Sequence, residues 1–367
     1  MIKEGKFGVQ EAVSLTVIAI VSKVFFSSPA ILAGLVGNTG WYMTFISAAV
    51  ALIGFGFIYL LLKRFPGKDL AEIFEISFGR VGGFAASGLL GFYMFFTTIT
   101  RTNEMTEFLK VYVMPLSPNW FVAGIFVACV FMLCMLGLES MARVSKLFIY
   151  FLVFGFAAVL AMGVQNYDVN NLFPILGQGL DKVAFHGVIR SSIYGEVIIL
   201  AIFAKSLHGV KYIKKEGIRA ILISVVIISA GLLACSLTFP NYIQQEITSP
   251  MYEMATLIDY GRFIQRVESI FLYVWVIGEF ISASIMFYSF IRLFCHSFRI
   301  TDKKPIVIGS CITLYALALM HKDIITIIAG YVAVIRGLGS LPMLTLPLIA
   351  LIVASIRKKG GDVQCAK

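Results

Sequence analysis

Charged side chains interrupt several long apolar stretches of this 367-residue sequence. An unpaired charge at the centre of a bilayer costs about 2.5–3.5 kcal/mol, so such residues pair with one another, bind a ligand or carry protons. The residues that could form a coupled charge network are Lys23, Glu104, Arg190, Glu196, Glu268 and Arg336, together with Arg101 and Glu279.

The sequence leaves the partners of these charges open. Arg101 and Glu104 lie three residues apart, so they could form an intrahelical ion pair or line a cavity. Glu268 and Glu279 are eleven residues apart, which places them on nearly the same helix face. Glu279 could carry a proton, or it could pair with Arg101, Arg190 or Arg336.

Lys23 lies one helical turn before the first predicted helix break. Its ammonium group could act as a fixed or titratable cation in place of a metal ion. The other interpretation is that Lys23 only neutralises a carboxylate. The candidate partners are Glu11, Glu104 and Glu196.

The sequence does not support catalytic or metal-binding chemistry. The histidines, His186, His208, His296 and His321, are isolated from one another, and the six cysteines lack metal-ligand spacing. We find no nucleophile–histidine–acid arrangement and no phosphate-binding loop. We therefore expect no enzyme activity, no catalytic residue, no metal and no cofactor.

The composition indicates a membrane protein. Apolar residues make up 59% of the chain, charged residues 14%, and the mean hydropathy is +0.91, whereas soluble domains have about a quarter charged residues. The length predicts a single transmembrane domain over residues 1–367. The first residues lack the pattern of a cleavable signal peptide, so we expect the first span to be retained.

We find ten apolar stretches of about 20 residues, the length that crosses a bilayer as a helix. They cover residues 9–36, 40–62, 82–109, 119–138, 142–164, 183–204, 215–238, 264–295, 305–320 and 338–356. The limits of the tenth are open, because residues 324–335 are also apolar and could form a short re-entrant piece. The prediction is an all-α polytopic membrane protein with ten transmembrane helices.

Lysine and arginine determine the predicted orientation, because they are retained in cytoplasmic loops. One side of the ten-span arrangement carries 21 of them and the other side carries 5. We therefore expect both termini in the cytoplasm and an amphipathic cytoplasmic helix over residues 65–83. The net charge of +10 is explained by this asymmetry and by anionic lipid, so it predicts no nucleic-acid partner.

The first span contains a helix-start signal near its middle. In the stretch KVFFSSPAILAG, a serine can cap a new helix and the proline after it fits the first helical position. This could be a simple proline kink or a true break, which survives in hydrocarbon only beside protein or a water-filled cavity. The residues concerned are Phe26, Ser27, Ser28, Pro29 and Ala30.

A second weak point, in the sixth span, favours true breaks in both. Arg190 and Glu196 flank it, and it consists of Ser192, Ile193, Tyr194 and Gly195. Spans one and six correspond in two halves of five spans, residues 9–164 and 183–356, and five spans per half give the halves opposite orientations. This is the pattern of a 5+5 inverted-repeat transporter fold, with helices 1 and 6 broken at the midplane and the substrate between them.

The chemistry of such a break suits a zwitterion. The half-helix that begins at Ser28 and Pro29 presents free N–H groups and a positive dipole end, which favour a carboxylate. The carbonyl groups before the break, around residues 24–26, favour an ammonium group. An amino acid satisfies both ends, whereas a sugar or a simple cation leaves one unpaired.

Four features of the sequence carry a family resemblance. They are the opening GKFGVQEAVSLTVIAIVSKVFFSSPA, the stretch FPGKDLAEI after span two, TRTNEMTEFL in span three, and a proline-rich last span that ends in IRKK. In their order and spacing, the chain resembles the permease-like B subunit of GerA-type spore germinant receptors. That endospore germination family belongs to the amino acid/polyamine/organocation superfamily, so the resemblance implies a LeuT-like fold.

The resemblance also implies a function, partners and a site. Members sense small germinants, often amino acids, in the inner membrane of spores, alongside another membrane subunit and a lipoprotein subunit. Superfamily ligands bind between spans one, three, six and eight. Besides the two breaks, this implicates Thr97, Thr98 and Arg101 in span three, and Glu279 and Ser282 in span eight.

Two functional hypotheses follow. In the first, the chain is the germinant-sensing subunit of a spore germination receptor, in which a bound ligand signals to partner subunits or opens a path for water or ions. In the second, the chain is a secondary amino acid transporter, with a proton carried on Glu279 or Glu196. Architecture alone does not separate them, because one fold supports both.

Overall fold

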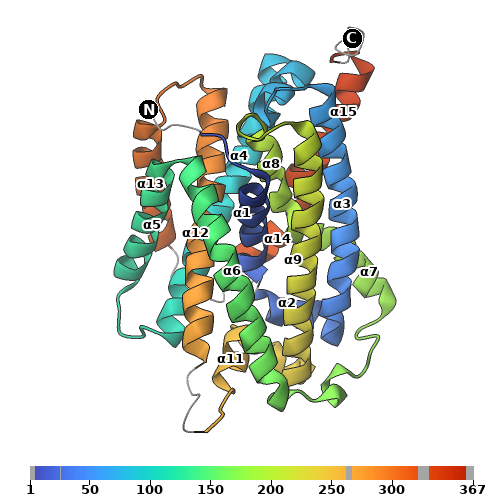
Figure 1. Cartoon of the computed structure of the whole chain (residues 1–367), viewed down its shortest axis with the longest axis vertical. Helices are drawn as coiled ribbons and strands as arrows, with labels where there is room; N and C mark the ends of the chain where they lie inside the picture. Colours follow the sequence, from blue (N-terminus) through green and yellow to red (C-terminus); the bar gives the residue numbers. More distant parts are fainter. Residues whose placement is uncertain (1–4, 25, 262–266, 321–329, 361–367) are drawn as a thin grey trace.

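The described residues form a bundle of helices that run mostly along the long axis of the molecule (Figure 1). This computed structural model describes residues 5–24, 26–261, 267–320 and 330–360, and over these ranges it contains helices and turns and no strand. The described residues nearest the two termini lie at the same end of the bundle.

The elements follow the apolar pattern of the sequence. The first span is divided into α1 (Val9–Val21) and α2 (Ser28–Val36), and the sixth begins with α7 (Leu180–Ile189) and ends with α8 (Ile199–Ile202). The other helices are α3 (Gly40–Arg64), α4 (Leu70–Tyr112), α5 (Asn119–Leu136), α6 (Leu138–Met162), α9 (Val210–Thr238), α10 (Asn241–Gln244), α11 (Pro250–Thr256), α12 (Glu268–Ser297), α13 (Lys304–Leu319), α14 (Ala333–Leu338) and α15 (Leu346–Ile356).

Eight helical stretches among the described residues are long and apolar enough to cross a membrane. The shorter apolar helix α13 has 16 residues, and α1 has 13 before the break. The number of ten spans stays a prediction. The expected limits of the last span were wrong, because residues 330–356 form one apolar helical stretch. This stretch includes residues 330–335 of the expected re-entrant piece, and residues 324–329 of that piece lie outside the described ranges.

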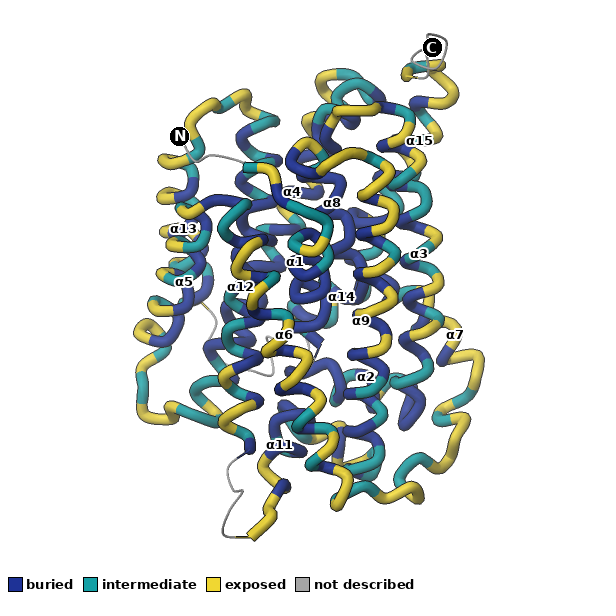
Figure 2. The backbone as a smooth tube through the Cα atoms, viewed as in Figure 1, coloured by how far each residue is buried: buried dark blue, intermediate teal, exposed yellow. Residues whose placement is uncertain are grey.

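Helix α1 lies at the centre of the bundle, and its residues are buried almost continuously from Ala12 to Val21 (Figure 2). It contacts α6, α9 and α12, and it also contacts the interrupted part of span six. The outer face of α6 carries exposed apolar side chains such as Leu147, Phe151 and Phe154. That distribution fits a membrane protein, because lipid covers the periphery and only the interior can hold polar groups.

The helix predicted over residues 65–83 is present as the first segment of α4, but its limits differ, because it begins at Leu70 and is kinked at Gly79. Asp69 caps it by accepting a hydrogen bond from the backbone N–H of Glu72 at 3.0 Å. At Gly79 the backbone is left-handed (φ 84°), so the first segment bends away from the long helix that follows. The kink separates the surface segment from the part of α4 that enters the core.

Close packing of α3 against α9 gives the first prediction. A Cβ added to Gly217 would overlap the ring of Phe55, so we expect Gly217→Ala to lower the free energy of unfolding by about 1–3 kcal/mol. Thermal unfolding of the purified protein measures this, and Phe55→Leu should restore part of the loss. The matched control is Gly309→Ala, which meets nothing within 4 Å; equal stability of the two alanine variants would contradict the prediction.

Candidate functional site

The break in span one lies where the sequence predicted it. Helix α1 ends at Val21, a turn of 3-10 helix covers Ser22–Val24, and α2 begins at Ser28 with Pro29 in its first turn. The expected capping residue was wrong by one position, because Ser27 rather than Ser28 is the N-cap. The structure describes the backbone on both sides of Phe25, which itself lies outside the described residues.

The interruption of span six takes the form of a 3-10 helix. Residues Arg190–Ile198 form it, and all nine are buried. A long 3-10 segment within a span has poorer hydrogen-bond geometry than an α-helix and often marks a hinge. Gly195 allows the close approach of span ten, because an added Cβ would overlap the side chain of Met343.

Arg101 joins four spans at the centre of the bundle. Its side chain is 3% exposed, and it donates hydrogen bonds to Glu196 at 3.1 Å and to Glu279 at 3.5 Å. It also donates to the hydroxyl of Ser282 and to the carbonyl oxygen of Ala19 at 3.3 Å. Span three is therefore joined through one guanidinium group to spans one, six and eight, as the predicted site requires.

Lys23 connects the two breaks directly. Its ammonium group forms an ion pair with Glu196 and donates a hydrogen bond to the carbonyl oxygen of Ser192 at 3.3 Å. Of the three candidate partners, Lys23 therefore pairs with Glu196, and Glu11 pairs with Lys146 at 2.7 Å instead. These two contacts place the residues before the span-one break against the interrupted part of span six.

Glu104 occupies the start of the second half of span one. Its carboxylate accepts hydrogen bonds from the hydroxyl and the backbone N–H of Ser27, the latter at 3.3 Å. Its other oxygen lies 4.0 Å from Arg336. Of the two alternatives for Arg101 and Glu104, the structure favours cavity lining, because among the described residues they pair with other spans rather than with each other. The expectation of free N–H groups at the helix terminus was wrong, because a carboxylate of the chain already occupies it.

Span ten completes the site. Arg336 donates to the carbonyl oxygen of Lys23 at 2.9 Å, and its own carbonyl oxygen accepts a hydrogen bond from Ser192 at 2.8 Å. These bonds bridge the last span to both breaks. The backbone carbonyl of Lys23 is therefore already bonded, while Val24 and Phe26 lie beside the gap as expected.

Arg190 differs from the other buried cations. It is 6% exposed, and its Nη1 atom has no hydrogen-bond partner among the described residues. It lies within electrostatic range of Arg336. Four cations and three carboxylates are gathered around the breaks, so the described cluster has one positive charge in excess. The cations are Lys23, Arg101, Arg190 and Arg336, and the carboxylates are Glu104, Glu196 and Glu279.

A cavity of about 30 Å³ lies within this cluster. A cavity of this size has room for about two or three water molecules. The residues that line it and were predicted are Lys23, Thr97, Arg101, Glu104, Ser192, Glu196 and Arg336.

Sequence reasoning missed four lining residues, Tyr93, Thr100, Val332 and Ile335. The signal for them was helical spacing. Tyr93 and Thr100 share a helix face with the predicted residues Thr97, Arg101 and Glu104, and Val332 and Ile335 lie four residues and one residue before Arg336.

Other predicted residues lie beside the cavity or away from it. The hydroxyl groups of Thr97 and Thr98 donate to carbonyl oxygens of their own helix, at 2.8 and 2.9 Å. Phe26 packs on Phe108 with ring centroids 4.9 Å apart.

Glu268 is the first residue of α12, about 16 Å along the helix from Glu279, and so it lies outside the cluster. The other members of the break segments, Ser28, Pro29, Ile193, Tyr194 and Gly195, are buried, while Ala30 is half-buried.

Metal coordination finds no support in this geometry. Within the ranges that the structure describes, no group of three or more histidine, cysteine, aspartate or glutamate side chains could hold a metal ion. What the arrangement can do is bind a charged small molecule and pass the effect to five spans through shared ion pairs.

Comparison with known families assigns this membrane protein. The family described as spore germination protein matches residues 7–327. The chain belongs to the spore germination protein family. The assignment confirms the resemblance seen in the sequence, and it groups the chain with permease-like membrane proteins rather than with enzymes.

Characterised members of the spore germination protein family are distant but cover most of the chain. Spore germination protein A2 of Bacillus subtilis (strain 168) is 23% identical over 293 residues, which is 77% of this chain and 78% of the relative. Spore germination protein KB of the same strain is 22% identical and covers 69% of each chain. Spore germination protein YndE, also from that strain, is 22% identical and covers 88% of each.

Solved structures identify the fold of this germination family member. Mhp1, a nucleobase-cation-symport-1 family transporter in a closed conformation, matches 97% of this chain and 80% of its own length with a TM-score of 0.70 and 12% identity. A Na⁺-coupled sialic acid symporter matches 95% of this chain and 80% of its own length, with a TM-score of 0.64 and 16% identity. The chain therefore has the LeuT fold, and the predicted fold class is confirmed.

Proposed function

We propose that the chain is the germinant-sensing subunit of a spore germination receptor. It binds a small ligand, an amino acid, where the breaks of spans one and six meet. The observation that carries this proposal is the buried charge cluster that joins both breaks to spans three, eight and ten. A group of charges shared among so many spans is suited to convert a local binding event into a change of packing.

The excess of one positive charge supports a ligand with a carboxylate. A buried guanidinium group with an unpaired N–H is costly unless it finds an acceptor, and Arg190 has such a group among the described residues. We assign the carboxylate of the ligand to Arg190, with Arg336 nearby. The carbonyl groups beside the gap in span one then accept the ammonium group.

Glu104 gives the site its two states. Its carboxylate accepts hydrogen bonds from Ser27 at the helix terminus and lies 4.0 Å from Arg336. A ligand carboxylate at Arg190 would compete with Glu104 for Arg336. Because a ligand can shift a conformational equilibrium only by binding one state better, displacement of Glu104 supplies the difference between the closed and the bound state.

The cavity is smaller than the proposed ligand. A space of about 30 Å³ does not hold an amino acid, so binding requires the packed spans to separate. In a receptor this movement is transmitted to partner subunits, for which we propose another membrane subunit and a lipoprotein subunit, or it opens a path for water or ions. The proposed location is the inner membrane of the bacterial cell or spore, with both termini in the cytoplasm.

The alternative is a secondary amino acid transporter. The observation that favours it is the LeuT fold shared with two symporters, together with buried carboxylates at Glu196 and Glu279 that could carry a proton. In this case the same movement would open the site alternately to the two sides of the membrane.

Binding and uptake measured on the same preparation test the proposal. The protein alone is reconstituted in liposomes, and a panel of labelled amino acids is assayed for binding at equilibrium and for accumulation under a pH or sodium gradient. We expect saturable binding without sustained accumulation. Accumulation driven by a gradient and absent from empty liposomes would replace the receptor with the transporter, and absence of any binding would contradict both.

A further inference from the structure

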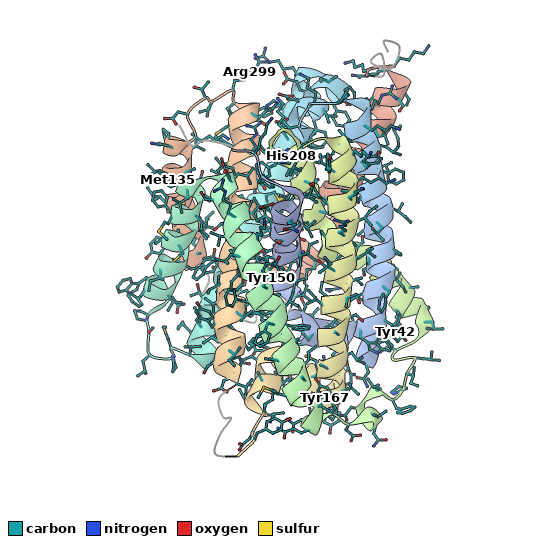
Figure 3. The ribbon with its side chains drawn as sticks, viewed as in Figure 1. Tyr42, Met135, Tyr150, Tyr167, His208 and Arg299 are labelled. Atoms are coloured by element: carbon teal, nitrogen blue, oxygen red, sulfur yellow. The ribbon has the colours of Figure 1, made fainter. Side chains whose placement is uncertain are left out.

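A second and larger cavity lies far from the charge cluster, at the end of the bundle that holds both described termini. Its volume is about 410 Å³, and its walls come from both sides of the α4 kink and from the end of α12 with the residues that follow it. Figure 3 labels Arg299, one of its lining residues, at this end of the molecule. The proposed ligand site uses none of these residues.

Fixed contacts hold the two walls of this cavity. The left-handed Gly79 turns the chain, and Gly83 then packs so closely that an added Cβ would lie 2.5 Å from the Cα atom of Glu75. Asp69 at the start of the segment accepts a hydrogen bond from Arg292 of α12 at 2.7 Å. The cavity is therefore a built feature of the α4 kink and does not depend on a mobile loop.

The polar part of the lining has an excess of positive charge. Arg299 and His296 both lie against Glu75, at 3.2 and 3.5 Å. Arg80 is exposed, and among the described residues it has no ion-pair partner. One carboxylate therefore faces two guanidinium groups, which leaves a site for an anion.

Serine hydroxyl groups add donors to this site. Ser87 lines the cavity and is 1% exposed, and its oxygen has no hydrogen-bond partner within the described ranges. The hydroxyl oxygen of Ser297 is also buried and has no hydrogen-bond partner within the described ranges. Two arginines and two free hydroxyl groups match the several acceptor oxygens of a phosphate group.

Apolar side chains lie beside these donors and remain exposed. Val81 is 83% exposed and follows Arg80 directly, while Phe84 and Phe298, with ring centroids 5.3 Å apart, are also exposed. Arg80 and Val81 stand where α4 leaves the surface and enters the bundle. The lining thus combines an anion site with an uncovered apolar face, as a phospholipid combines a phosphate group with acyl chains.

We propose that this cavity binds an anionic phospholipid from the leaflet on the side of the termini. Arg80 and Arg299 contact the phosphate, and Ser87 donates a hydrogen bond to it. The acyl chains lie along Val81 and Phe84. This role is independent of the proposed ligand site and goes beyond it.

Native mass spectrometry of the detergent-solubilised protein, titrated with phosphatidylglycerol, tests the proposal. We expect one retained lipid, with affinity lowered at least about tenfold in Arg80→Gln/Arg299→Gln, since each basic residue near a lipid headgroup contributes about fivefold. Val81→Ser should lower it about threefold by removing apolar contact. The control Lys211→Gln/Lys215→Gln removes the same charge from exposed residues of α9 and should bind as wild type.

Several results would overturn this assignment. Equal loss in the lysine control would mean that the lipid senses only the overall charge, and unchanged binding in the arginine variant would remove the site. Displacement of the lipid by millimolar inorganic phosphate, or insensitivity to Val81→Ser, would assign the cavity to a soluble anion. Should the double variant fail to fold, Arg80→Gln alone serves, because this exposed side chain has no ion pair among the described residues; it should lose about fivefold.

Discussion

Replacing Lys23 with methionine is expected to lower the free energy of unfolding by about 3–5 kcal/mol. Glu196 is paired with both Lys23 and Arg101, and Arg101 is shared with Glu279. Without the ammonium group, two buried carboxylates depend on one guanidinium group. Glu196 then loses its ammonium partner and must share Arg101 with Glu279, and breaking a buried ion pair by removing one partner is strongly destabilising.

A double-mutant cycle separates this electrostatic effect from a loss of packing. Glu196→Gln alone should also be strongly destabilising, because it leaves Lys23 unpaired. The double variant Lys23→Met/Glu196→Gln keeps Arg101 and Glu279 as a balanced pair, so it should be more stable than either single variant. Denaturant or thermal unfolding of the purified protein gives the coupling energy.

The exposed ion pair between Arg143 and Glu139 provides the matched control. Its arginine side chain is 73% exposed, so Arg143→Met should change the free energy of unfolding by less than about 1 kcal/mol. If Lys23→Met were no worse than this control, or if the double variant showed the sum of the single losses, the two breaks would not be joined by a buried ion pair.

The position of the site could be predicted from residue types. Serine followed by proline in the middle of an apolar span predicts a new helix, and α2 begins there. Each charge in an apolar run must find a partner because hydrocarbon offers none. That rule placed Lys23, Arg101 and Glu196 in one cluster before any coordinates.

The pairing inside the cluster could not be predicted. Whether Arg101 contacts Glu104 on its own helix or Glu279 on α12 depends on how α4 and α12 are rotated about their axes, and packing of the whole bundle determines this. The same limit explains the wrong expectation at the helix terminus. Sequence shows that the terminus favours an anion, but it does not show that Glu104 from another span reaches it first.

The 3-10 form of span six also depends on tertiary packing. Gly195 permits several backbone conformations, so the sequence predicts a weak point without its geometry. Three contacts favour one conformation: Met343 approaches Gly195 closely, Lys23 donates a hydrogen bond to the carbonyl oxygen of Ser192, and the hydroxyl of Ser192 donates to the carbonyl oxygen of Arg336. These contacts come from spans one and ten, which are remote in sequence.

Arg190→Gln is expected to lower the affinity for the amino acid ligand by about 10- to 150-fold, the range for a hydrogen bond to a charged group. The variant removes the guanidinium group that we assign to the ligand carboxylate. Binding is measured as in the wild-type assay, with the amino acid that binds the wild-type protein. Arg219→Gln, which removes an exposed arginine of α9, is the matched control and should bind normally.

The same variant should be as stable as the wild-type protein, or more stable. Among the described residues Arg190 has no ion pair to lose, its Nη1 atom is buried without an acceptor, and Arg336 repels it. Glutamine at this position removes the repulsion from Arg336 and the cost of burying a charge, and its neutral amide costs less to bury without an acceptor than a guanidinium group does. A structural arginine would behave in the opposite way, because its removal would lower stability and disturb binding only indirectly. Lower stability with intact binding would therefore contradict the assignment. Weak binding in a variant that unfolds at the same or a higher temperature than the wild-type protein would instead show that Arg190 serves the ligand rather than the fold.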